Sequence, residues 1–103
     1  MEQHAAWHPE TMAVRAGREL SPFGEHSQGL YLTSSFTFDS AEEGAALFLG
    51  TADGYTYSRF TNPTVNAFQE RLAVLEGGER ATATASGMAA IQAVMLTFLQ
   101  AGD

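Results

Sequence analysis

The sequence predicts an α/β chain that is mostly helical and carries a long extended arm in its first half. The clearest observation is a helical pattern over residues 62–76, where apolar residues recur every three or four positions. A run of small residues at 80–85 has strand composition, and a second helical pattern starts at Met88. Upstream, residues 30–38 are rich in aromatic residues and threonine, which favours an extended conformation.

The first part of the chain is expected to hold one short helix. Residues 9–16 form it, because Pro9 suits the first turn of a helix and Gly17 suits the position just past its end. Residues 1–8 form a frayed arm, and the glycines and prolines of residues 17–29 indicate a loop.

The extended arm at residues 30–38 leads into a second helix. An extended segment with no helix or sheet partner must find its hydrogen bonds elsewhere, for example on another subunit. Ser40 and Glu43 then have the spacing of a capping box, in which a hydroxyl and a carboxylate satisfy the first amides of a helix. That helix runs to about Leu49 and ends at Gly50.

The second half contains the two longer helices. Asn62 caps the first of them, with Pro63 at its first position, and Gly77 ends it. Residues 80–85 are expected to form a short buried strand of small residues. After the turn at residues 86–88, the next helix places a set of apolar side chains at helical spacing: Met88, Ile91, Val94, Met95, Phe98 and Leu99.

Composition excludes several classes of function. The formal net charge is −7, and all five cations besides histidine are arginines. Nucleic acids and anionic membranes are therefore not expected as partners, because both need basic surfaces. There is no cysteine, which fits a cytoplasmic protein, and no window approaches the roughly 18 apolar residues of a membrane span.

Histidines give no metal site. His4 and His8 have the four-residue spacing of metal ligands on a helix, but no carboxylate or further histidine completes a set, and His26 stands alone in a loop. A solvated tail with isolated histidines is the simpler interpretation, and no metal is predicted.

Two stretches have the residue types of a phosphate site. Ser86, Gly87 and Met88 lie where a strand turns into a helix, and the first amides of a helix attract anions. Tyr57 and Arg59 are two residues apart in an extended segment, so a phenol and a guanidinium fork can point the same way. For each stretch alone the simpler interpretation is favoured, namely plain packing at residues 86–88 and a surface arginine beside a packing tyrosine at residues 57–59.

Taken together, the two stretches resemble a known family. Residues 57–64 (Tyr-Ser-Arg-Phe-Thr-Asn-Pro-Thr) and residues 85–91 (Ala-Ser-Gly-Met-Ala-Ala-Ile) are similar to motifs of the Cys/Met-metabolism enzymes that depend on pyridoxal phosphate, the cystathionine γ-synthase-like group. Residues 11–17 and 32–36 also resemble the N-terminal arm of that family. The resemblance runs in the right order over nearly the whole chain from about residue 10.

The resemblance implies a fold and a set of roles. Residues 1–60 would be the N-terminal arm that wraps a partner subunit, and residues 61–103 the start of the cofactor-binding large domain of a fold-type I transferase. Ser86, Gly87 and Met88 would hold the cofactor phosphate of their own subunit, while Tyr57 and Arg59 would hold that of a neighbour. The protein would be a homotetramer, a dimer of dimers, acting on a small amino-acid substrate.

Residues 28–35 (Gln-Gly-Leu-Tyr-Leu-Thr-Ser-Ser) look like the O-succinylhomoserine sulfhydrylase branch of the family, in which sulfide replaces succinate to give homocysteine for methionine biosynthesis. Methionine γ-lyase and cystathionine γ-synthase or lyase activities remain alternatives.

The family's Schiff-base lysine has no counterpart, because the chain has no lysine. No catalytic residue is therefore predicted here, and these residues alone are expected to be inactive. The Gly-Asp ending predicts the front part of a longer protein; if the chain were complete, a non-enzymatic module that binds a phosphorylated ligand or a partner would be the alternative.

Overall fold

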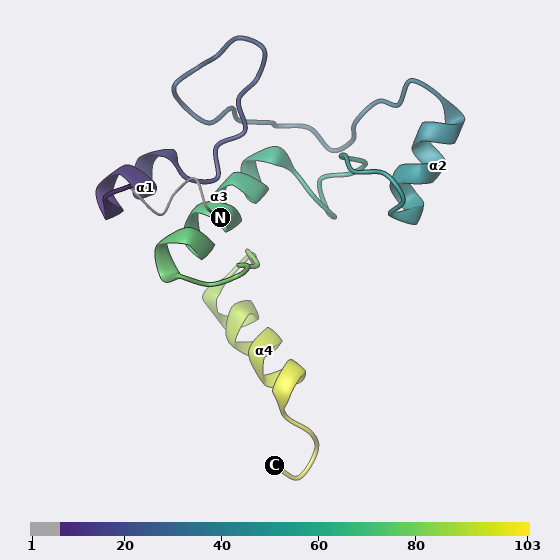
Figure 1. Ribbon diagram of the computed structural model, residues 1–103. Coiled ribbons are helices and arrows are strands. Elements are labelled where there is room, and N and C mark those ends of the chain that lie inside the picture. The colour runs from purple at the N-terminus through teal and green to yellow at the C-terminus, as the bar shows by residue number, and fades with distance from the viewer. Residues whose placement is uncertain (1–6) are drawn as a thin grey trace.

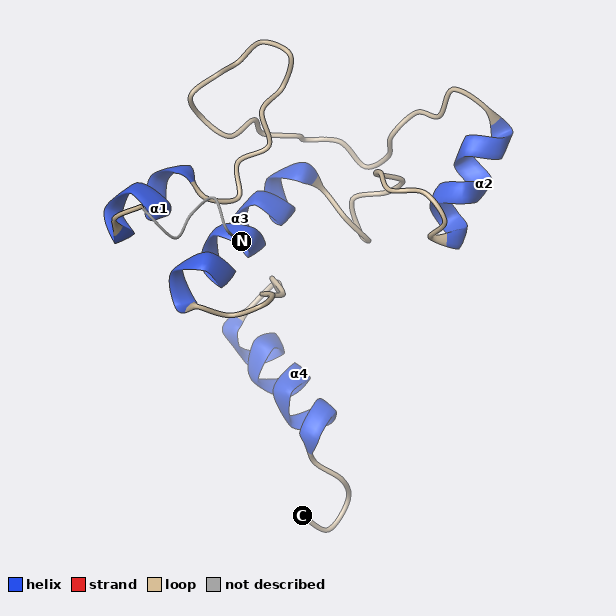
Figure 2. Cartoon of the chain, viewed as in Figure 1, coloured by secondary structure: helices blue, strands red, loops and turns tan. Residues whose placement is uncertain are grey.

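The computed structural model describes residues 7–103 and contains four α-helices joined by long connections (Figure 1). They are α1 (Pro9–Arg15), α2 (Ala41–Leu49), α3 (Pro63–Glu76) and α4 (Gly87–Phe98). The described residues contain no β-strand, only one isolated bridge, as Figure 2 shows by colour. The expected helices over residues 9–16, 40–49, 62–76 and from 88 onward are thus all present, within one or two residues.

The molecule is open. Its radius of gyration is 16.5 Å, whereas a compact chain of this length would have about 13 Å. The buried residues of the described part are small: Ala16, Ala67 and Ala73 are buried, together with Gly44, Asn62 and Pro63, and no large apolar side chain is. In Figure 1, α2 and α4 project away from the junction of α1 and α3. None of the described helices is both long and apolar enough to span a bilayer.

The closest packing joins α1 to α3. Gly17 follows α1 with a φ of +64°, and a Cβ added there would lie 2.5 Å from the Ala67 carbonyl oxygen of α3. The Arg71 Nε donates to the Ala16 carbonyl oxygen at 2.9 Å, which satisfies the end of α1. Glycine is therefore required at position 17 both for the left-handed backbone and for the close approach.

The extended arm is held within its own chain near residues 34–36. Ser35 forms an antiparallel bridge with Tyr57. The Phe36 amide donates to the Thr56 carbonyl oxygen at 3.1 Å, and the Ser58 amide donates to the Ser34 carbonyl oxygen at 2.9 Å. The expectation that the arm has no backbone partner in its own chain is wrong for these residues, because residues 56–58 supply the partners.

Helix α2 begins with the expected capping box. The Ser40 hydroxyl accepts from the Glu43 amide at 3.0 Å. The Glu43 carboxylate reaches back to the Asp39 amide at 2.6 Å, one residue before the cap. Gly50 ends the helix in the left-handed conformation, as the sequence predicts.

The strand expected at residues 80–85 is wrong for the described structure. The segment runs beside α3, where the Ala83 amide donates to the Gln69 side-chain oxygen at 2.8 Å. A strand requires the backbone of a neighbouring strand, and no other described segment pairs with residues 80–85. Ala81 and Ala83 are half-buried rather than buried.

Candidate functional site

The first half of the candidate site is a tight turn that presents Arg59. The Tyr57 carbonyl oxygen accepts from the Phe60 amide at 2.9 Å and from the Thr61 amide at 3.2 Å. Tyr57 is half-buried, whereas Arg59 is exposed at the tip. Local backbone bonding therefore fixes the turn and leaves the arginine side chain facing outward.

Two aromatic rings hold the Arg59 guanidinium. Its Cζ lies 4.9 Å from the centroid of the Tyr57 ring and 5.5 Å from that of the Phe60 ring. The two rings meet edge to face, with centroids 6.4 Å apart. Stacking uses the flat faces of the guanidinium and leaves the N–H groups at its edge available to an anion. In the described part of the chain, no carboxylate or carbonyl oxygen bonds to Arg59.

The structure thus brings Tyr57 and Arg59 together, as their spacing predicts. It adds Phe60, which sequence reasoning did not single out. An aromatic residue next to an arginine in a turn is a weak signal, because the sequence alone does not show on which side of the turn each side chain lies.

A polar network lies directly behind the turn. Asn62 is only 5% exposed and its side-chain Nδ2 donates to the Tyr31 carbonyl oxygen at 3.0 Å and to the Ser58 hydroxyl at 2.9 Å. Its Oδ1 accepts from the Thr64 amide at 2.9 Å and so caps α3. The Ser58 hydroxyl in turn donates to the Thr33 carbonyl oxygen at 2.5 Å.

Thr64 extends the network to the start of the arm. Its hydroxyl donates to the Gly29 carbonyl oxygen at 3.0 Å and accepts from the Tyr31 amide at 2.9 Å. The Asn-Pro-Thr sequence therefore both starts a helix and bonds the arm to it.

The second half of the candidate site is the N-terminus of α4. The Ser86 hydroxyl accepts from the Ala89 amide at 3.1 Å. The amides of Gly87 and Met88 precede the first intrahelical bond and so have no partner inside the helix. A Cβ added at Gly87 would meet no atom within 4 Å, and Ser86, Gly87 and Met88 are all exposed. This end of the helix has the open space and the unpaired donors that a phosphate group needs.

The two halves do not meet in the described structure. No described hydrogen bond or ring contact joins residues 57–60 to residues 86–88. Each half separately presents hydrogen-bond donors of the kind that bind phosphate groups in proteins.

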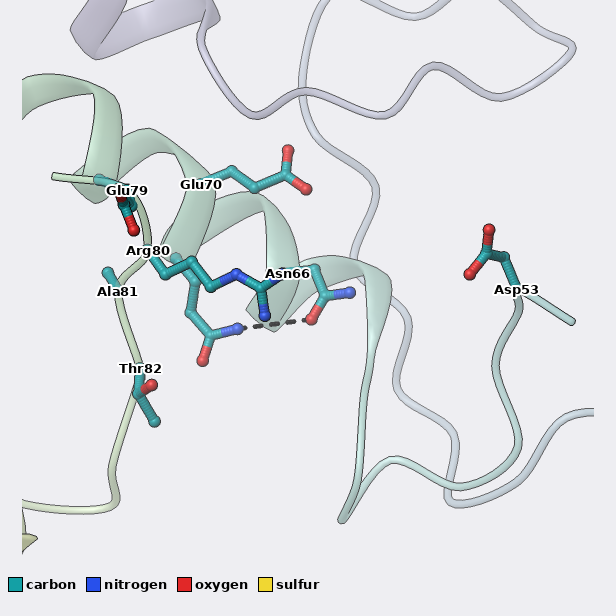
Figure 3. A pocket seen from close by; sticks show the side chains of 9 residues that line it. Asp53, Asn66, Glu70, Glu79, Arg80, Ala81 and Thr82 are labelled. Atoms are coloured by element: carbon teal, nitrogen blue, oxygen red, sulfur yellow. Dashed lines mark hydrogen bonds between the residues drawn. The ribbon is translucent and has the colours of Figure 1, made fainter. Parts of the chain in front are cut away.

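A separate open pocket lies beside α3 and residues 79–82 (Figure 3). It has a volume of about 690 Å³ and is lined by Asp53, Asn66, Gln69, Glu70, Ala73, Glu79, Arg80, Ala81 and Thr82. Acidic side chains outnumber its single arginine, and it contains none of the predicted phosphate-binding residues. Among the described residues, no group of three or more metal-ligating side chains gathers anywhere; His4 lies outside the described residues.

The Tyr55 phenol, near the start of α3, has a raised pKa. Burial of the phenol raises its pKa above the ordinary value, and a hydrogen bond of 2.9 Å to the Glu19 carboxylate raises it further. The Asn66 amide approaches the same phenol oxygen at 3.4 Å and acts in the opposite direction. Tyr55 is therefore a structural phenol that stays protonated.

These features are typical of a protein that binds a phosphorylated cofactor. An extended arm bonded to an arginine turn, followed by a helix with open amides at its N-terminus, can hold the phosphate of a cofactor at two places. The residues present fit the phosphate of pyridoxal phosphate, since one half supplies a guanidinium and a phenol and the other supplies backbone amides.

Comparison with known proteins shows the family. The model of the Cys/Met metabolism PLP-dependent enzymes matches residues 10–103, and the chain belongs to this family, whose cofactor is pyridoxal phosphate. O-succinylhomoserine sulfhydrylase of Pseudomonas aeruginosa is 52% identical over 94 residues, which is 91% of this chain and 23% of the relative. L-methionine gamma-lyase of Fusobacterium nucleatum subsp. polymorphum is 44% identical over 93 residues, which is 90% of this chain and 24% of that relative.

Solved structures agree on the fold. A putative O-acetylhomoserine (thiol)-lyase from Campylobacter jejuni, whose structure contains a pyridoxyl-lysine phosphate, superimposes with a TM-score of 0.85 at 31% identity. The match covers 94% of this chain and 23% of that one. The chain therefore has the α/β fold of the first part of a fold-type I pyridoxal-phosphate enzyme, and it spans 23–24% of the length of each of these three proteins.

Proposed function

We propose that this chain is the N-terminal segment of an enzyme that makes homocysteine from O-succinylhomoserine and sulfide. The similarity to sulfhydrylases supports this substrate choice, at 52% identity to the relative from Pseudomonas aeruginosa and 46% to one from Mycobacterium tuberculosis. Bound pyridoxal phosphate would supply the electron sink that stabilises the amino acid after loss of its α proton. In this proposal the residues of this chain anchor the cofactor phosphate and take no part in the proton transfers of the reaction.

The anchoring role is supported above all by the contacts of the Arg59 guanidinium. In a chain with twelve acidic residues and five arginines, its guanidinium stacks on two rings and bonds to no described oxygen. A cation kept away from carboxylates is suited to an anion that comes from outside the chain.

We propose further that Tyr57 and Arg59 hold the phosphate of a neighbouring subunit, while Ser86, Gly87 and Met88 hold that of their own. The lack of contact between the two halves supports this division, because one phosphate group would have to touch both. The enzyme would then require at least a dimer, and we propose a homotetramer built from two such dimers, with residues 1–60 as its arm and residues 61–103 as the start of its large domain.

A second candidate activity is methionine γ-lyase, which is favoured by 44% identity to the relative from Fusobacterium nucleatum. A cystathionine γ-synthase or lyase is a further alternative, which rests only on membership of the Cys/Met metabolism family.

One assay separates these activities. The full-length protein is incubated with pyridoxal phosphate, sulfide and O-succinylhomoserine, and separately with methionine or cystathionine. We expect homocysteine from the first mixture. Release of a keto acid and ammonia from methionine, with no homocysteine from O-succinylhomoserine, would assign the lyase instead. Residues 1–103 alone should give no product in any mixture, because they contain no lysine for the Schiff base.

A further inference from the structure

We propose that Asn62, acting with Ser58, is a positioning residue that holds Arg59 in place to receive a phosphate. The inference rests on the proposed role of Arg59 as a phosphate ligand. It assigns to Asn62 a task beyond capping α3, and it does not require Asn62 to touch the cofactor.

The oxygen and the nitrogen of the Asn62 side-chain amide make bonds to different parts of the chain. Capping uses only the Oδ1, which accepts from the Thr64 amide. Serine or aspartate would cap about equally well. The Nδ2 is not needed for the cap, yet it makes two bonds of 2.9 and 3.0 Å, to the Ser58 hydroxyl and to the Tyr31 carbonyl oxygen. Neither serine nor ionised aspartate can donate both bonds from this position.

Arg59 lies between two residues that hydrogen bonds hold in place. Ser58 precedes it and is held by its amide, which donates to the Ser34 carbonyl oxygen, and by its hydroxyl, which donates to the Thr33 carbonyl oxygen. Asn62 follows three residues later and is nearly fully buried. The arginine turn is thus fastened at both ends, and the Nδ2 bond to Ser58 joins these two ends directly.

The Arg59 side chain itself is held only weakly within the described structure. Its only described contacts are with the rings of Tyr57 and Phe60, which belong to the same turn. If the turn moves, the rings and the guanidinium move together. The geometry at the phosphate therefore depends on the bonds behind the turn, which are those of Asn62 and Ser58.

The test measures cofactor affinity in the full-length protein. Four proteins are compared: wild type, Asn62→Ser, Arg59→Ala and the double variant. Asn62→Ser keeps a cap for α3 and removes both Nδ2 bonds. We expect Arg59→Ala to weaken pyridoxal-phosphate binding by about tenfold to a hundredfold, through loss of a charge-assisted contact. Asn62→Ser should weaken binding roughly fivefold to tenfold, because in a smaller fraction of molecules the turn at residues 57–60 would have the conformation that binds phosphate.

The decisive result is the double variant. If Asn62 acts through Arg59, the Asn62→Ser change should weaken affinity by less than about twofold once Arg59 is alanine, since neighbouring residues that act together are not additive. The phosphorus NMR signal of the bound cofactor should shift in Asn62→Ser in the same direction as in Arg59→Ala. Ser58→Ala, which removes the same link from its other end, should reproduce the effect of Asn62→Ser.

A matched control separates positioning from general stability. Ser40→Ala removes the cap of α2, which has no described hydrogen bond to the arginine turn, and should lower stability without changing cofactor affinity or the phosphorus signal. Additive losses in the double variant, or unchanged affinity in Asn62→Ser, would overturn the inference while leaving the role of Arg59 intact. Unchanged affinity in Arg59→Ala would instead remove the proposed phosphate ligand itself.

Discussion

Replacing Gly17 by alanine tests the close packing of α1 on α3. The backbone at Gly17 has a φ of +64°, which costs an L-residue about 1–2 kcal/mol. The added Cβ would also lie 2.5 Å from the Ala67 carbonyl oxygen and 2.7 Å from the Arg71 amide nitrogen. Both are backbone atoms of a helix and cannot rotate away, so α1 must shift, at a further cost of about 1–3 kcal/mol for overpacking. We expect Gly17→Ala to lower the free energy of unfolding by about 2–5 kcal/mol in total.

Gly77→Ala is the matched control. Gly77 has nearly the same φ, +66°, but a Cβ there would meet nothing within 4 Å. It should therefore lose only the conformational part, about 1–2 kcal/mol. Urea unfolding of the full-length variants, followed by circular dichroism, gives the difference, and amide hydrogen exchange of residues 9–15 locates it. Equal losses for the two variants would refute the close approach of Gly17 to α3.

Two further predictions concern Tyr55 and Gln69. Because burial and then the Glu19 carboxylate raise the Tyr55 pKa, the folded state holds this proton to higher pH than the unfolded chain does. Its contribution is complete below the ordinary value of 10.0 and is lost as pH rises through the raised pKa. Tyr55→Phe should flatten the alkaline stability profile, and an unchanged profile would contradict the assignment. Gln69→Ala removes the acceptor of the Ala83 amide, so exchange of that amide should accelerate, by about fivefold for a loss near 1 kcal/mol, whereas the exposed-site control Gln92→Ala should leave it unchanged.

The helices could be predicted because their signals are local. Three of the four described helices start at a side chain that accepts from an amide two or three residues ahead, namely Ser40, Asn62 and Ser86, while α1 has a proline in its first turn instead. Gly50 and Gly77 end two helices in the left-handed conformation, which few other residues adopt. Such bonds form within one turn of chain, so their residue types can be read without knowing the rest of the fold.

The pairing of distant segments could not be predicted in the same way. The strand expected at residues 80–85 depended on a partner that the described residues do not supply. The arm was expected to lack partners in its own chain, yet it pairs with residues 56–58. Period-two composition shows that a segment is extended but contains no information about which backbone lies next to it. For the same reason, Asn62 was predicted as a cap, and its bonds to Tyr31 and Ser58 were missed.

Arg59 differs from Arg71 and Arg18 in what holds its guanidinium, and this difference suits it to a ligand from outside the chain. Arg71 and Arg18 each donate to a backbone carbonyl oxygen of their own chain, at 2.9 and 2.5 Å, so their donors serve local structure. Arg59 instead lies over the two rings of its own turn. Stacking holds a guanidinium without using its N–H groups, which a carboxylate or carbonyl partner would occupy. In the proposed site, the N–H groups of Arg59 remain available to the phosphate, and the uncharged hydrogen bonds of Asn62 and Ser58 set their position.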